Sequence, residues 1–398
     1  MEPSRRRAAP AADRLISLPE HLLDNILTRL PLLDAVRTSA LARAWRRRWE
    51  SLPALSLSFL DHLGTPSSIV DGVLIRYSGR ISRFGLCVVP RIADRVDQWL
   101  IASSRRGVAS IDLRSDVKYL HLHSSIFSCV HLVVLKLSRQ LEAIIGGSPL
   151  LRVLKIDCLV IPDQRNVVIN ALNLCSLTIT SWVGHGCAWR IAELPHLDNA
   201  TFRLDSYAQE HGFREFLARA AHVRKLILKK FCAPHIGDIL QETLPLVNLR
   251  SLFLCTHFCG RHAISSTFCL LRNAPALEEL EIQIDDYDEE EEVEANAVFQ
   301  YAQSTNGLCA SLQAVKMTGI GGLPNEMRFI ELILSKATVL RTMSVNLGRG
   351  SKMYSEKALS ELNTYRRASP HAQVFFKGSG NTHWAVETTT DEESSFSE

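Results

Sequence analysis

Cysteine and histidine gather most densely in the stretch CTHFCGRH, where Cys255, His257, Cys259 and His262 lie within eight residues. These side chains bind zinc in many proteins, so zinc binding is the first chemistry they suggest. Structural zinc sites, however, usually place two ligand pairs well apart along the chain. All four residues here are crowded at the end of an expected strand. We therefore expect no metal and no cofactor.

Motifs of the common enzyme classes are absent from the sequence. It contains no phosphate-binding loop, no dinucleotide fingerprint and no nucleophile elbow. The stretches HLH at 121–123 and GHGC at 184–187 have no partners at ligand spacing. We therefore expect a protein that is not an enzyme and that acts by binding.

Another cluster, LARAWRRRW at residues 41–49, holds four arginines and two tryptophans. At about 100° per residue along a helix, Leu41, Trp45 and Trp49 share one apolar stripe, and most of the arginines point elsewhere. A stacking surface for nucleic acid needs exposed rings among the cations. The pattern therefore favours an amphipathic helix with its rings inward. Nucleic-acid binding is the weaker alternative and predicts a steep dependence of binding on salt.

The composition is typical of a globular protein. The 398 residues are 46% hydrophobic and 22% charged, with a net charge of +3. This charge gives no reason to expect a nucleic-acid partner, and no apolar run reaches the ~18 residues of a membrane span. The start lacks the apolar stretch of a signal peptide, and the ten cysteines show no disulfide spacing. We expect reduced cysteines, no membrane contact, and a location in the nucleus and/or cytoplasm.

The most strongly patterned part of the chain lies within its first sixty residues. Apolar residues recur there at helical spacing, and Pro31 stops the first of three expected short helices. A segment of this size hides only a modest share of its surface. Its surplus apolar surface implies a partner, or a second domain of the same chain.

The stretch LPEHLLDNILTRLPLLDAVRTSALARAWRRRW resembles an F-box. The similarity includes the Leu-Pro start, I-L-x-x-L-P in the first helix, D-A-V-x-T-S-x-L and a W-R-x-x-W end. It implies docking onto a Skp-type adaptor of a cullin-RING ubiquitin ligase of the SCF class, with Trp45 and Trp49 holding the helices together. One departure is Ala42-Arg43-Ala44, where many relatives carry a serine and two basic residues. The residues that the resemblance implies for the adaptor face, or for its support, are Leu18, Pro19, Leu22, Leu23, Ile26, Leu27, Leu30, Pro31, Val36 and Leu41.

From about residue 110, a pattern of apolar residues recurs as L-x-x-L-x-L. Most intervals are about 19–28 residues, the range of leucine-rich repeats. Strands and helices that alternate at this spacing stack into a solenoid in which each repeat covers its neighbour. The alternative is an irregular α/β domain with coincidental strings. The leading residues are Leu132, Leu151, Leu174, Leu197, Val223, Leu249, Leu277, Leu312 and Leu340.

Residues between the strand leucines are expected on the open face of the solenoid, where a target protein could bind. They are mixed in charge and specify no ligand. These candidates are Lys136, Lys155, Thr178, Arg203, Lys225, Ser251, Glu279, Glu281 and Lys316.

The C-terminal part predicts a strand, a helix from about Asn325 to Lys336, a strand, a further helix and a last strand at AQVFF. Its signature L-x-x-V-x-M-x-G, followed by a closing R-x-x-S-P-x-A-Q-V-x-F, resembles the FBD domain of plant F-box/leucine-rich-repeat proteins. The acidic run 285–294 is expected to be a solvated loop because like charges repel. The polar, acidic end of the chain is expected to be disordered.

These expectations give an α/β chain with a three-helix F-box, an irregular leucine-rich-repeat solenoid and an FBD-like α/β cap. The predicted boundaries are a leader at 1–12, the F-box at 13–59, repeats at 60–307, the cap at 308–376 and a tail at 377–398. The expected function is that of a substrate-recognition subunit, which links the adaptor, and through it cullin and RING subunits, to an unknown target protein. A leucine-rich scaffold or inhibitor that assembles no ligase is the alternative.

Overall fold

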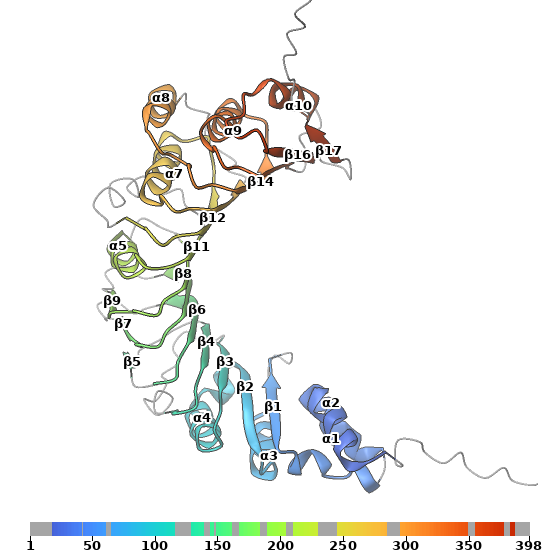
Figure 1. Cartoon of the computed structure of the whole chain (residues 1–398). Coiled ribbons are helices and arrows are strands. Elements are labelled where there is room, and N and C mark those ends of the chain that lie inside the picture. Colours follow the sequence, from blue (N-terminus) through green and yellow to red (C-terminus); the bar gives the residue numbers. More distant parts are fainter. Residues whose placement is uncertain are drawn as a thin grey trace, which may run out of the picture. The chain divides into compact units, whose positions relative to one another are not determined.

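The structure is a computed structural model of the chain (Figure 1). It describes residues 18–41, 43–60, 65–115, 129–138, 144–146, 149–160, 167–183, 189–203, 210–229, 245–284, 295–348, 355–377 and 383–386. The chain divides into two compact units, Met1–Arg139 (unit 1) and Gln140–Glu398 (unit 2). The predicted leader, the acidic run 285–294 and the last residues of the tail lie outside the described residues.

Unit 1 begins with helices and continues as a sheet. Helix α1 starts right after Pro19, and α2 starts right after Pro31, because proline fits the start of a helix and not its interior. The elements are α1 Glu20–Arg29, α2 Leu32–Arg37, the 3₁₀ turns η1 Thr38–Ala40, η2 Arg43–Trp45 and η3 Arg48–Ser51, β1 Ala54–Phe59, α3 Ser67–Arg76, β2 Arg80–Val88, η4 Pro90–Arg95, α4 Val96–Arg105, β3 Ser110–Ser115 and β4 Val134–Ser138.

The tryptophan segment differs from its prediction. The expected third helix is two 3₁₀ turns, because Arg47 between them has a left-handed backbone with φ of 63°, which cannot continue a right-handed helix. The expected burial of the rings is nevertheless present: Trp45 is 5% exposed and Trp49 is 3% exposed.

The sheet of unit 1 starts earlier than the repeat pattern indicated. Strands β1, β2, β3 and β4 pair in this order, all parallel, so two strands precede residue 110. One face of the sheet is apolar, with Phe84, Ile111 and Leu135 in register and fully buried. Helices α3 and α4 lie on that side (Figure 1). The other face is the outward face of unit 1.

Unit 2 alternates strands with helices or shorter strands. Its elements are β5 Ile144–Gly146, β6 Val153–Val160, β7 Val167–Asn170, β8 Ser176–Val183, β9 Trp189–Ile191, β10 Asn199–Arg203, α5 Glu210–Arg219, β11 Lys225–Lys229, β12 Ser251–Thr256, α7 Arg261–Asn273, β13 Glu279–Ile284, α8 Asn296–Ser304, β14 Ala314–Ile320, α9 Pro324–Lys336, β15 Thr342–Leu347, α10 Ser355–Thr364, β16 Gln373–Lys377 and β17 His383–Val386.

The main sheet of unit 2 runs β6-β8-β10-β11-β12-β13-β14-β15-β16, and these strands are parallel. Strand β17 closes it antiparallel to β16. A second sheet, β5-β7-β9, lies on the same side as α5 (Figure 1). The side of the main sheet that carries no helices is the outward face of unit 2.

A repeated turn before each strand confirms the predicted repeats. Eight of the nine leading apolar residues donate their backbone N–H to the carbonyl three residues earlier, at 3.0–3.4 Å, from Leu132 to Leu340. Each of the nine is at most 4% exposed. The large parallel sheet with these turns has the predicted architecture of stacked repeats.

The C-terminal part follows the predicted order of elements and adds one. Helix α9 matches the expected Asn325–Lys336 closely, and β16 covers four of the five residues of the expected last strand. Strand β17 follows it and lies inside the segment predicted as a disordered tail. Glu326, 1% exposed, accepts the N–H groups of Gly321, Gly322 and Leu323 at 2.9, 2.8 and 3.0 Å, which fixes the start of α9.

Candidate functional site

Helix α1 has one side in the core of unit 1 and one side in solvent. Leu23 and Leu27 are 4% and 0% exposed. Leu22 and Ile26 lie one helical turn apart and remain 39% and 38% exposed. Residues at this spacing share a face of the helix, so the two side chains form an apolar ridge open to solvent.

The structure divides the ten predicted adaptor residues into two sets. Leu23 and Leu27 lie inside unit 1 and support the helix from within. The remaining eight reach solvent at least in part: Leu18, Leu30 and Val36 are half-buried, and Pro19, Leu22, Ile26, Pro31 and Leu41 are exposed, Leu41 at 72%. The exposed members are available for a partner.

Arg48 holds the tryptophan segment against α1. Its Nε donates to Asp24 Oδ1 at 2.8 Å, and its Nη2 donates to the carbonyl of Glu20 at 3.0 Å. Its side chain is 17% exposed, so this ion pair is partly shielded from water. The helical wheel gave no sign of this contact with a residue 24 positions earlier.

The loop after α3 anchors the same segment to the sheet. The hydroxyl of Tyr77 lies 3.2 Å from the carbonyl oxygen of Leu52 and 2.9 Å from that of Arg80. A side chain at Gly79 would place its Cβ 2.1 Å from the oxygen of Leu52, so only glycine fits. These contacts fix the N-terminal helices on the first strands of unit 1.

The nine predicted target-binding residues all lie on outward faces. In unit 2 the strand register aligns them in rows: one row holds Lys225, Ser251 and Glu279, and the next holds Lys155, Thr178, Glu281 and Lys316. Arg203 lies two residues along β10, at the level of Lys229. All are exposed or half-buried. The alternation expected of leucine-rich strands is therefore confirmed at these positions.

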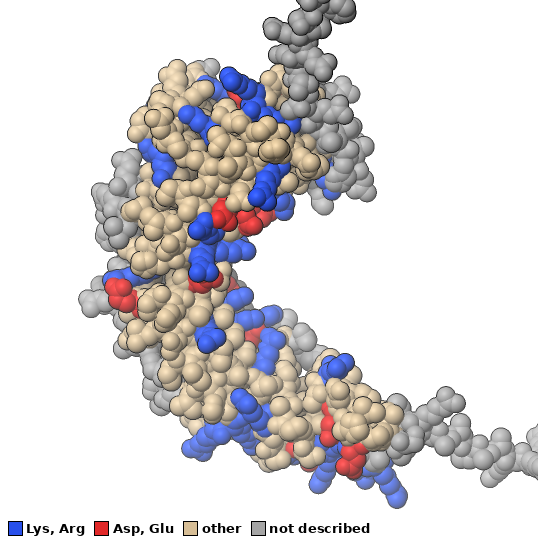
Figure 2. All heavy atoms as spheres, in the orientation of Figure 1, with Lys and Arg blue, Asp and Glu red and all other residues tan. Residues whose placement is uncertain are grey.

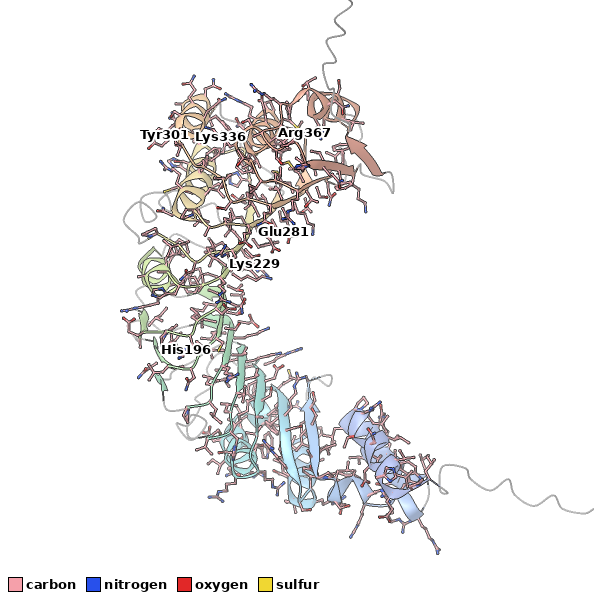
Figure 3. The ribbon with its side chains drawn as sticks, in the orientation of Figure 1. His196, Lys229, Glu281, Tyr301, Lys336 and Arg367 are labelled. Atoms are coloured by element: carbon pink, nitrogen blue, oxygen red, sulfur yellow. The ribbon has the colours of Figure 1, made fainter. Side chains whose placement is uncertain are left out.

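The outward face of unit 2 mixes both signs of charge. Lys316 Nζ lies 2.7 Å from Glu281 Oε1, one cation to one carboxylate. Figure 3 shows Lys229 and Glu281 on the side of the sheet that faces away from α5 and α7. Acidic and basic atoms lie close together there (Figure 2). A target with charges of both signs fits such a face.

The ninth residue, Lys136, belongs to a cluster on the outward face of unit 1. Asp112, whose side chain is 5% exposed, is approached by Arg83 Nη2 at 3.0 Å, Arg114 Nε at 3.8 Å and Lys136 Nζ at 4.0 Å. We call these four residues the Asp112 cluster. The sequence did not predict Arg83, Asp112 and Arg114. Extending the alternation of the strands to the chain before residue 131 could have found them. Figure 2 shows basic atoms over β3 and β4.

Cys255 and His257 of the cysteine and histidine stretch lie in the packed interior, whereas Cys259 is half-buried and His262 is exposed. Cys255 is 9% exposed and His257 is 3% exposed, and the backbone N–H of Gly260 lies 3.4 Å from Nδ1 of His257. Across the described ranges, no group of three or more His, Cys, Asp or Glu side chains is placed to hold a metal ion. No helix in those ranges is long and apolar enough to cross a membrane.

Comparison with known proteins places the N-terminal segment in a domain family. Residues 15–56 match the F-box domain. An F-box/FBD/LRR-repeat protein of Arabidopsis thaliana is 26% identical over 425 residues, covering 92% of this chain and 98% of that protein. A second protein of this description from the same plant is 22% identical over 455 residues, covering 93% and 97%. The chain thus carries an F-box domain at its N-terminus and is similar over most of its length to plant F-box/FBD/LRR-repeat proteins.

Proposed function

We propose that this protein is the substrate-recognition subunit of an SCF-type cullin-RING ubiquitin ligase. The F-box indicates binding to a Skp-type adaptor in general. In this proposal the adaptor links the chain to cullin and RING subunits. The repeats and the FBD-like part hold a target protein, and the ligase transfers ubiquitin to that target.

The observation that carries the proposal is the exposed apolar ridge of α1. Leu22 and Ile26 reach solvent although Leu23 and Leu27, their neighbours in the same helix, are buried. The tryptophans are buried in the core of unit 1, and the ridge is not part of that core, so it is available to another molecule. A scaffold that never meets an adaptor has no need to leave this face uncovered.

The chain itself forms no bond in this proposal. It brings the target close to the conjugating enzyme, and proximity raises the effective concentration of the target lysine. Proteins of the F-box/LRR family are generally non-catalytic adaptors. The same assignment puts the protein in the nucleus or cytoplasm, which a fluorescent fusion can test.

Co-expression with a Skp-type adaptor, followed by a pull-down, tests the proposal. We expect the full chain to recover adaptor and the variant Leu22→Glu with Ile26→Glu to lose it. The control carries Ile69→Glu with Ile75→Glu on α3, where both isoleucines are exposed, 42% and 80%. Equal adaptor recovery by wild type and the α1 variant, or no recovery by wild type, would favour the scaffold instead.

A further inference from the structure

The Asp112 cluster carries more positive than negative charge. Three cations surround one carboxylate, and no other carboxylate of the described residues lies within 4.0 Å of Arg83, Arg114 or Lys136. Ion pairs elsewhere, such as Lys316–Glu281 and Arg224–Asp198, match one cation with one acid. The cluster therefore has a net charge of +2 and attracts an anion.

The sheet holds the three cations together before any ligand arrives. Lys136 lies directly across from Asp112 on the neighbouring strand, Arg114 lies two residues further along β3, and Arg83 comes from β2. The buried carboxylate offsets the repulsion among them. Strand register and the shared carboxylate thus keep the three cations near one another before a ligand binds, which favours affinity.

Solvent reaches all three cations. The side chains of Arg83, Arg114 and Lys136 are 42%, 59% and 36% exposed. The cluster thus keeps donors that Asp112 does not use, on the face where Lys136 was expected to meet a target.

We propose that the Asp112 cluster binds the phosphate of a phosphorylated residue in the target protein. A phosphate ester carries about −1.5 to −2 charge near pH 7, which matches the net charge of the cluster. Two guanidinium groups can each donate more than one hydrogen bond to its oxygens. A single carboxylate would neutralise only half of the excess charge. The proposal rests on the target-binding role proposed above and specifies the class of target.

Degenerate peptide pools with a fixed central phosphoserine provide a direct test. Their binding to the full chain is measured by fluorescence anisotropy and compared with pools that carry serine or glutamate at the same place. We expect the phosphoserine pool to bind most tightly. Arg114→Gln with Lys136→Gln should weaken its binding at least about tenfold, because two charge-assisted contacts are lost.

The matched control is Arg224→Gln with Arg250→Gln, which removes the cations of the one-to-one ion pairs Arg224–Asp198 and Arg250–Glu278. Its phosphoserine binding should stay within about twofold of wild type. Equal binding of the phosphoserine and serine pools, or equal effects of the two double variants, overturns the proposal. A glutamate pool that binds as well as phosphoserine also overturns it, since the site would then be one for carboxylates. Thermal unfolding of the same preparations shows whether a variant is misfolded. Adaptor recovery from them shows whether the proposed function itself fails.

Discussion

Replacing Leu22, Ile26 and Leu41 together by alanine should weaken adaptor binding by about 30- to 1000-fold. The three side chains are 39%, 38% and 72% exposed, which together amounts to about one and a half fully exposed side chains. Full burial of such a side chain contributes about 1.5–3 kcal/mol, so their burial by a partner contributes about 2–4 kcal/mol. At about 1.4 kcal/mol per tenfold change in Kd, the stated range follows.

Titration calorimetry of the purified chain with a Skp-type adaptor measures this change, and thermal unfolding shows that the fold is retained. The matched control is Ile69→Ala with Ile75→Ala on α3, which should leave Kd within about twofold because exposed positions outside the interface contribute little. A triple variant that binds within threefold of wild type while remaining folded, or a control that loses as much affinity, would refute the reasoning.

Three further changes test the architecture. Leu27→Ala, at a fully buried position, should lower the free energy of unfolding by about 2–5 kcal/mol in urea titrations. Glu326→Ala should lower it by about 2–4 kcal/mol in the same assay, because three backbone N–H groups lose a charged acceptor; a loss below ~1 kcal/mol would contradict this role. Burial raises the pKa of Tyr77 from 10.0 to about 12. Since the folded pKa is the higher one, the phenol stabilises the fold fully below pH 10, and this contribution is lost between about pH 10 and 12. Tyr77→Phe should flatten that alkaline loss of stability, and absorbance at alkaline pH should show one fewer late-titrating tyrosine.

The repeats were predictable because their signal is local and regular. An apolar residue before each strand and two within it recur at a nearly constant spacing, and eight of the nine leading residues form the same i to i−3 backbone hydrogen bond. The strands β1 and β2 were missed because their sequences, ALSLSF and RISRFGLCV, lack the full L-x-x-L-x-L string. Pairing with β3 places them in the sheet all the same.

The helical wheel correctly predicted that Trp45 and Trp49 are buried, but it grouped Leu41 with them although Leu41 is 72% exposed, and it could not detect the break in the helix. The backbone turns at Arg47, which is left-handed, and the next residue, Arg48, contacts Asp24 of α1. This contact joins residues far apart in sequence, so no local pattern contains it.

The sequence by itself determined an F-box-like start, a run of leucine-rich strands and an outward set of polar side chains, because these depend on residue type and short spacing. Only the tertiary structure decided which leucines of α1 remain exposed, since Leu22 and Leu23 both fit the helical pattern and packing buries one of them. It also assembled the Asp112 cluster, whose residues come from three strands about one repeat apart in sequence. Parallel register brings such residues within a few ångströms, and it exists only once the sheet has formed.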